Sequence, residues 1–197
     1  MYRDAIVDAA ERLFAAQGYE ATKIQDIAKD AGISLGTLYS VFDGKASILD
    51  GVHQHRLSEL FSLVGPDLAG SLSASERLLL GNRVFVKWLV SHRNYLSIHL
   101  QNNVGWGSSP HGVGADLEGA WDRGVRLMAT VIEQGMCEGA LYQSDPIVAA
   151  RIMVSIQQVL ISAWIESGTK QDPDDVCDEI EELIVRALFR RDDERKR

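Results

Sequence analysis

The residues best suited to chemistry lie in one short stretch, Ser34 to Ser40, with the sequence S-L-G-T-L-Y-S. A helix through this stretch would turn one face outward without a single Lys or Glu. That face consists of Leu35, Gly36, Tyr39 and Ser40, with Thr37 at its edge. Such a face is unusual in plain solvent but suits a DNA groove. There hydroxyls bond phosphates or base edges, a glycine allows close backbone approach, and a leucine contacts a thymine methyl.

Two helices joined by a tight turn would position this face. Thr22 is an N-cap residue type with Gln25 three residues later, which predicts a capping box at the start of a first helix. Gly32 suits the left-handed conformation that ends a helix, and Ser34 is again an N-cap type. A turn of this length containing Gly is typical of a helix-turn-helix. Lys45 begins the next helix, where a cation and free amides can hold a phosphate.

Three pieces of the first fifty residues match a known pattern. They are I-V-D-A-A-E-R-L-F-A-A-Q-G-Y-E-A-T from Ile6, I-A-K-D-A-G-I-S from Ile27, and G-T-L-Y-x-x-F from Gly36, followed by Lys45. Residues 6 to 49 thereby resemble the DNA-binding domain of the TetR family of transcriptional regulators. The resemblance implies phosphate contacts by Tyr39 and Lys45, with Leu35, Gly36, Thr37 and Ser40 nearest the bases.

One position departs from the family pattern, and the departure removes a contact with the DNA backbone. Position 41 is often Tyr or His in the family and can donate to a phosphate, whereas Val41 cannot. The residues predicted to contact DNA are Thr22, Lys23, Ser34, Leu35, Gly36, Thr37, Tyr39, Ser40 and Lys45.

The charge balance opposes a protein that coats nucleic acid without specificity. The net charge is −8, and the first fifty residues carry five basic against eight acidic side chains, or −3. We therefore expect weak non-specific affinity and a modest salt dependence. An alternative is a helical adaptor that kept the fold and whose DNA binding is degenerate. Salt-dependent binding to a palindrome separates the two.

An enzyme is the rival class, and the sequence offers it no motif. No H-E-x-x-H, no Glu-x-x-His pair, no Walker loop and no complete G-x-G-x-x-G occurs, so no catalytic residue and no cofactor is predicted. His53 and His55 are two residues apart, whereas a metal pair on one helix face needs three or four, so no metal site is predicted. Because no charged stretch followed by an apolar run opens the sequence, we expect a cytoplasmic protein in which Cys137 and Cys177 are reduced thiols.

The whole chain is predicted to be all-α, with about nine helices in two domains. At 197 residues and 46% hydrophobic content it can bury a substantial core. The predicted domains are a helix-turn-helix domain over 1–46 and a helical effector-binding and dimerisation domain over 47–197. Ser73 with Glu76, Asp145-Pro146 and Asp172-Pro173 each mark a helix start.

The two last helices carry more apolar surface than one small body covers. Only Arg151 is charged between Ile147 and Ile165, and a helix buried on nearly all sides is favoured over a membrane span. A twin pair of these helices across a two-fold axis would give a homodimer, which the resemblance also implies. A palindromic operator with half-sites about one helical turn apart would follow.

Aromatic side chains in the later helices suggest a ligand cavity, although plain core is the alternative for each. The resemblance implies a small-molecule effector, and apolar walls favour an apolar or aromatic one. The candidate pocket residues are Phe61, Trp88, His92, Trp121, Val125, Met128 and Trp164. The hypothesis is a repressor whose ligand tilts the helix after Lys45. The Gly-rich stretch 105–114 is either a lid or a surface loop.

Overall fold

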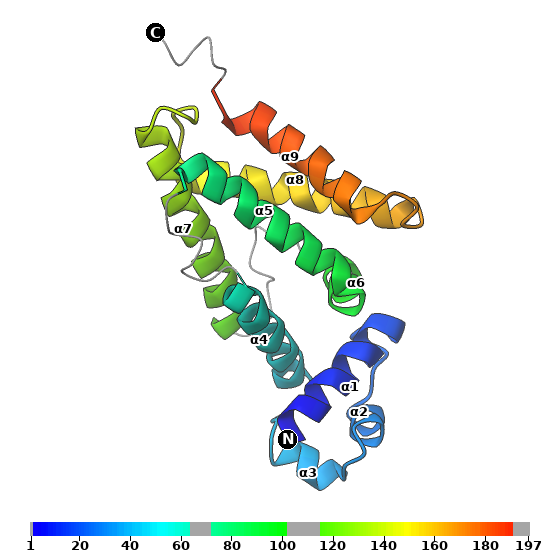
Figure 1. Cartoon of the computed structure of the whole chain (residues 1–197). Helices are drawn as coiled ribbons and strands as arrows, with labels where there is room; N and C mark the ends of the chain where they lie inside the picture. Colours follow the sequence, from blue (N-terminus) through cyan, green and yellow to red (C-terminus); the bar gives the residue numbers. More distant parts are fainter. Residues whose placement is uncertain (1, 64–71, 102–114, 191–197) are drawn as a thin grey trace.

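The computed structural model describes residues 2–63, 72–101 and 115–190, and of residues 101 and 115–123 it describes the backbone alone. Each named element in these ranges is an α-helix (Figure 1), which confirms the all-α fold class. In chain order they are α1 (Tyr2–Gln17), α2 (Ile24–Asp30), α3 (Leu35–Tyr39), α4 (Lys45–Leu63), α5 (Ala74–Ser91), α6 (Arg93–Gln101), α7 (Ala115–Cys137), α8 (Pro146–Glu166) and α9 (Pro173–Leu188). The stretch 105–114 lies outside the described residues.

The head, which we define as α1, α2 and α3, closes around one apolar core. Its members are no more than 4% exposed and come from all three helices and the turn after α3. They are Ile6, Ala9, Ala10, Phe14, Ile27, Ala28, Leu38 and Phe42. Gly32, with φ +68°, adopts the left-handed conformation that the turn between α2 and α3 requires. The apolar stripe of α1 therefore forms part of the core of the head.

The body, which we define as α5 to α9, is built around a ring of four helices. Helices α5 and α8 each pack against both α7 and α9, so α5 lies diagonally opposite α8. Helix α6 joins the end of α5 to α1, and α4 runs from the head to α7 (Figure 1). The head therefore meets the body through α4 and α6.

Most of the predicted helix starts are confirmed by their caps. The Ser73 hydroxyl accepts from the Glu76 amide, and the Glu76 side chain accepts from the Ser73 amide, which completes the capping box of α5. Asp145 caps α8 and Asp172 caps α9, each with proline as the next residue.

The capping box predicted at Thr22 is wrong. The residue before α2 is Lys23, which forms no side-chain cap, and the Thr22 hydroxyl instead donates to the Gly18 carbonyl at 2.7 Å. The carbonyl groups that end α1 lie close to this side chain and compete successfully for its hydroxyl. Thr22 thus closes the first helix and does not open the second.

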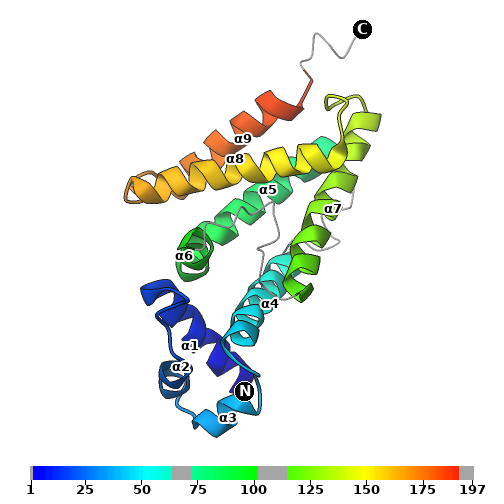
Figure 2. The same cartoon turned by 180° about the vertical axis from the view of Figure 1, so that it is seen from behind.

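The prediction that α8 is buried on nearly all sides is also wrong. Val148, Ile152 and Val159 share one face of α8 and are 50%, 42% and 65% exposed. Seen from behind, α8 runs in front of α5 (Figure 2). The apolar pattern surrounds the helix, and pattern alone does not tell which face a neighbour covers.

Within the described ranges, α8 is also the one helix long and apolar enough to cross a membrane by length and composition. Of its most apolar window, 39% is buried inside the bundle. Gln157 in the middle of α8 donates to Asn82 of α5 at 2.7 Å inside the body. Such a buried polar bond is the mark of a core helix, and one helix of this composition is weak evidence for a membrane span.

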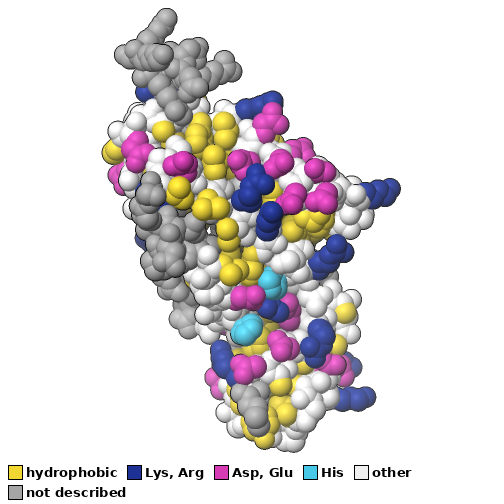
Figure 3. All heavy atoms as spheres, viewed as in Figure 1, with side chains coloured by type: hydrophobic (Ala, Val, Ile, Leu, Met, Phe, Trp, Pro, Cys, Tyr) yellow, Lys and Arg dark blue, Asp and Glu magenta, His cyan; other side chains and the backbone are white. Residues whose placement is uncertain are grey.

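Helix α9 is fixed to the body at both its side and its end. Arg83 of α5 pairs with Asp178 at 2.7 Å, and Lys87 pairs with Asp174 at 2.6 Å. The space-filling view shows acidic and basic side chains next to one another over α5 and α9 (Figure 3). After α9, Leu141 and Phe189 form an isolated antiparallel bridge that joins the end of the helix to the α7–α8 connection.

Candidate nucleic-acid interface and its junction with the body

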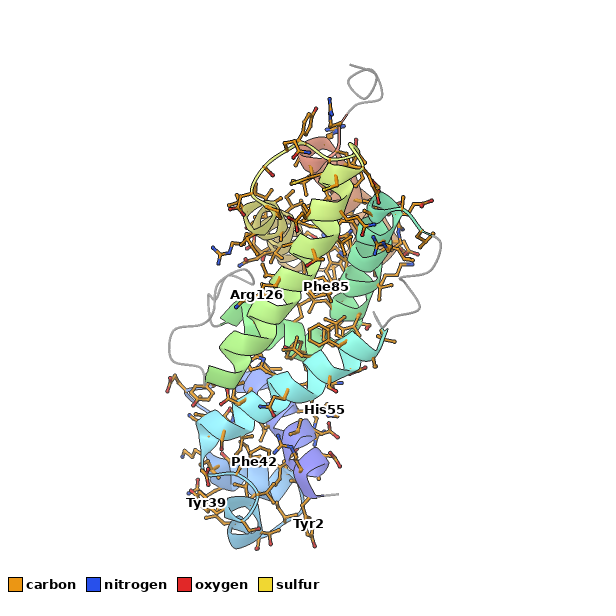
Figure 4. The ribbon with its side chains drawn as sticks, turned by 90° about the vertical axis from the view of Figure 1, so that its left-hand side faces the viewer. Tyr2, Tyr39, Phe42, His55, Phe85 and Arg126 are labelled. Carbon is orange, nitrogen blue, oxygen red and sulfur yellow. The ribbon has the colours of Figure 1, made fainter. Side chains whose placement is uncertain are left out.

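The outward face of α3 has the composition that the sequence predicted. Leu38 is fully buried beneath the helix, whereas Leu35 is 36% and Tyr39 49% exposed. Tyr39 lies at the end of the head furthest from the body (Figure 4). Gly36 and Ser40 are exposed beside them, and Thr37 lies at the edge, half-buried. The structure therefore brings six of the predicted residues together, from Ser34 to Ser40.

The hydroxyl groups of this face also hold the short helix in shape. The Ser34 hydroxyl accepts from the Thr37 amide at 3.0 Å and lies 2.8 Å from the Thr37 hydroxyl. The Ser40 hydroxyl donates to the Thr37 carbonyl at 2.7 Å. Each oxygen keeps a lone pair that can still accept a hydrogen bond. Helix α3 is thus held by its own side chains, with its outer face ready for a groove.

Thr22 and Lys45 have partners inside the protein. Thr22 is 2% exposed, and this burial argues against a side-chain contact with DNA. The Lys45 ammonium donates to the carbonyls of Tyr19, Glu20 and Thr22 at 2.7, 3.2 and 3.1 Å. It also lies 4.4 Å from the centre of the Tyr19 ring. Lys45 therefore joins the start of α4 to the α1–α2 connection in this conformation.

The remaining cations of the head divide into two groups. Arg12 pairs with Asp30 at 2.7 Å, and Arg3 donates to Gln54 while its guanidinium lies over the Phe42 ring. Lys23 and Lys29 are exposed on and beside α2, and no ion pair joins either of them to another described residue. These two lysines are the head cations best placed to meet a phosphate.

Where the head meets the body, four charged or titratable side chains form a continuous chain, Glu11–Arg56–Glu59–His92. Arg56 of α4 donates to Glu11 of α1 at 2.8 and 3.3 Å and to Glu59 at 2.8 Å. Glu59 in turn lies 3.1 Å from His92 at the end of α5. Burial alone would lower the pKa of Arg56, but its bonds to the two carboxylates raise it. We call this chain, together with the rings described next, the junction.

Two histidines and a tyrosine lie beside this chain in the interior. The His53 Nδ1 is 3.2 Å from the Tyr95 hydroxyl, and the Tyr95 and His99 rings meet edge to face at 4.6 Å. Burial lowers the pKa of His53 to about 4 and that of His99 to about 3, so both are neutral at pH 7. Within the described part of the chain, no three His, Cys, Asp or Glu side chains are grouped so that they could hold a metal ion.

The candidate pocket residues do not all lie at one place. Trp88 stacks on His92 with ring centres 4.6 Å apart, and the Phe61 ring lies against α7 at Gly124. Trp164, near the end of α8, donates to the Gln171 carbonyl at 2.9 Å. Val125 is buried and Met128 half-buried on α7, whereas the side chain of Trp121 lies outside the described residues.

The junction was not predicted from the sequence, although the sequence contains one signal of it. Glu11 falls in the buried stripe of α1 between Val7 and Phe14, and it is 4% exposed. A carboxylate in an apolar stripe requires a cationic partner, because an unpaired buried charge is very unfavourable. That partner, Arg56, lies forty-five residues away in the sequence, so only the fold identifies it.

Known proteins match the chain both locally and over its length. The sequence profile described as bacterial regulatory proteins, tetR family, matches residues 6–52. The chain is 24% identical to an uncharacterised HTH-type transcriptional regulator, YhgD, and 23% identical to a fatty acid metabolism regulator protein, both of Bacillus subtilis. These alignments cover 93% of the chain and 94% and 93% of the relatives. The solved structure of a fatty acid degradation regulator, FadR, from Bacillus halodurans has a TM-score of 0.82 at 19% identity, covering 93% of this chain and 94% of that one.

Proposed function

The chain belongs to the TetR family of bacterial regulatory proteins, and we propose that it is a repressor released from a palindromic operator by a small, mainly apolar effector. Members of this family are transcriptional regulators and not enzymes. We propose that residues 1–46 bind the DNA and that residues 47–197 bind the effector and a second copy, in the cytoplasm.

The outward face of α3 is the observation that carries the DNA-binding proposal. Its exposed leucine, glycine and hydroxyl groups match a major groove in chemistry, and Leu38 fixes the helix onto the head beneath them. We propose Leu35, Gly36, Thr37 and Ser40 as the residues nearest the bases and Tyr39 as a phosphate contact. Lys23 and Ser34 flank this face.

Selection of bound duplexes from random and genomic DNA by the purified protein tests this proposal. Tyr39→Ala is the matched variant, because Tyr39 is exposed and its loss leaves the core of the head intact. A palindrome that the protein enriches and the variant does not would support the proposal. If no sequence is enriched at low salt, the helical adaptor with degenerate DNA binding replaces it.

A second copy of the chain is the proposed cover of the open face of α8. A shallow groove runs along α8 and reaches α9, and its walls are almost wholly apolar. Its lining residues are Val148, Arg151, Ile152, Ser155, Ile156, Val159, Leu160 and Leu183. Pairing of this groove across a two-fold axis would bury it in a four-helix bundle and place two heads on successive major grooves. We expect the Val159→Glu variant to sediment as a monomer and the parent protein to sediment as a dimer.

The effector is proposed to bind in the body and to act through α4. Two relatives are named for fatty acid metabolism or degradation, which supports a ligand with an apolar chain. Phe61, Trp88, His92, Trp121, Val125, Met128 and Trp164 remain the proposed pocket residues. A ligand must bind the released state more tightly than the DNA-bound state, or no release occurs. This scheme would be contradicted if the affinity for the operator stayed the same with every ligand tested and in the Trp121→Ala variant.

A further inference from the structure

A pair of amide side chains lies at the centre of the body. Asn82 of α5 and Gln157 of α8 are 2% and 1% exposed, and the Gln157 Nε2 donates to the Asn82 Oδ1 at 2.7 Å. Because α5 and α8 lie diagonally across the ring of α5, α7, α8 and α9, this bond crosses the interior of the ring. Neither residue contributes to the head, the junction or the groove along α8.

The single bond engages one polar atom of each amide and leaves the other polar atom of each without a partner. The Asn82 Nδ2 and the Gln157 Oε1 are buried and have no hydrogen-bond partner among the described residues. Exchanging the nitrogen and oxygen of both amides would again leave one donor and one acceptor. Buried amide groups are unfavourable without a partner, so this pair is suited to receive one.

Apart from Asn82 and Gln157, the described side chains that are buried in the ring are apolar. The charged side chains of the same part of α5, Arg83 and Lys87, are engaged with acidic residues of α9 at the surface. Many of the buried side chains of the ring are aliphatic, among them Leu78, Val86, Ala129, Ile132, Val154 and Ile161. In apolar surroundings an ionised group is far less favourable than a neutral group that forms hydrogen bonds to the two amides.

We propose that Asn82 and Gln157 are the polar anchor of the effector site and that they select an uncharged amide or lactam attached to an apolar chain. The carbonyl of such a ligand accepts from Asn82, and its N–H donates to Gln157. A ligand with only an acceptor, such as an ester, leaves Gln157 without a partner. This inference rests on the proposed effector site and adds the chemical class of its ligand.

The test compares two probes with the same acyl chain and carbonyl, of which one carries N–H donors and the other carries two N-methyl groups in their place. Octanamide presents a carbonyl and an N–H, whereas N,N-dimethyloctanamide presents the carbonyl alone. We expect calorimetry to show binding of octanamide that is about ten-fold or more tighter than that of the dimethyl amide, because a buried acceptor left unpaired disfavours the complex. Octanamide should also shift the side-chain NH₂ signals of Asn82 and Gln157 in ¹⁵N–¹H spectra. Equal binding of both probes, or of neither, would overturn the proposal.

Two variants test whether the preference for octanamide arises at Asn82 and Gln157. Asn82→Leu/Gln157→Leu removes donor and acceptor together, which leaves no unpaired polar group, and it should unfold at a temperature similar to the parent while losing the preference for octanamide. Gly81→Ala is the matched control, because a Cβ at Gly81 meets nothing within 4 Å, and it should keep that preference. A preference that survives in the double variant would place the ligand elsewhere and overturn the proposal. These measurements need no DNA, so operator selection with Tyr39→Ala judges the proposed function separately.

Discussion

Inside the head, apolar side chains from α1, α2 and α3 bury against one another, whereas the junction buries charged and titratable groups between the head and the body. Ile6, Ile27 and Leu38 are fully buried in the head. At the junction, Glu11 and Arg56 form an ion pair with side chains only 5% and 19% exposed. The same helix, α4, takes part in both regions.

The two kinds of contact respond to different changes. Apolar packing depends steeply on shape and not on pH, so the head should act as a rigid unit. Buried charges and neutral histidines depend on protonation and on each partner being present. A regulator needs one part that keeps its shape and one part whose arrangement can change, and the junction has the chemistry for the second.

Acidification should lower the free energy of unfolding through the junction and not through the apolar core of the head. This is the largest effect that we expect. His53 and His99 have folded pKa values of about 4 and about 3, below the ordinary 6.5. The unfolded chain therefore binds protons first as pH falls below 6.5. Stability present above that pH is lost between 6.5 and about 4 for His53, and between 6.5 and about 3 for His99. We expect about 2 kcal/mol of lost stability for each histidine between pH 7 and pH 5.

Urea unfolding at pH 7 and pH 5 measures this loss. His99→Phe keeps an aromatic ring at that position without a titrating nitrogen, and it should show about half of the pH dependence of the parent. An unchanged dependence in the variant would mean that other groups cause the acid response.

Removal of the junction cation should have the next largest effect. Arg56→Met leaves the Glu11 carboxylate buried without its partner, which should cost about 3 kcal/mol of unfolding free energy. Arg83→Met removes an arginine of the body that also pairs with two carboxylates, but at the surface, and should cost less than about 1 kcal/mol. Equal losses in the two variants, measured by urea unfolding at pH 7, would contradict the distinction between junction and surface.

The apolar contact between α4 and the head should respond to shape. A Cβ at Gly51 would lie 2.7 Å from the Phe42 Cε1 atom and 3.5 Å from the Val7 Cγ2 atom, so the ring would have to move. We expect Gly51→Ala to lower stability by about 2 kcal/mol and to weaken operator binding. Gly81→Ala, also within a helix but open to space, should raise stability by about 0.5–1 kcal/mol. Thermal unfolding of the two variants checks both signs.

Features set by neighbouring residues could be predicted from the sequence. Caps such as Ser73 with Glu76 and stops such as Gly32 act within one helical turn, so helix bounds follow from them. The outward face of α3 could also be predicted from the sequence, because a five-residue helix has one buried side and Leu38 determines which side that is.

Features that depend on the fold could not be predicted. Thr22 has the pattern of an N-cap, yet the carbonyl of Gly18 lies nearer to its hydroxyl. The bridge between Leu141 and Phe189, the ion pair of Arg56 with Glu11, and the bond between Asn82 and Gln157 each join distant parts of the chain. Periodicity identifies which residues are apolar or polar, and only the packing decides which of them meet.

Lys45, like Thr22, is a residue at which sequence and structure give different expectations. As a phosphate contact it would contribute to the salt dependence of DNA binding, whereas as a link to the carbonyls of Tyr19, Glu20 and Thr22 it would contribute to the shape of the head. We expect Lys45→Met to lower stability by about 1 kcal/mol, since three hydrogen bonds at a partly exposed site are exchanged for water. We also expect operator affinity to fall with the slope of log K against log salt unchanged. Lys23→Met, by contrast, should reduce that slope by about 1 because Lys23 is exposed. A reduced slope for Lys45→Met would mean that the ammonium leaves its carbonyls when DNA binds, and that the head, too, rearranges on its operator.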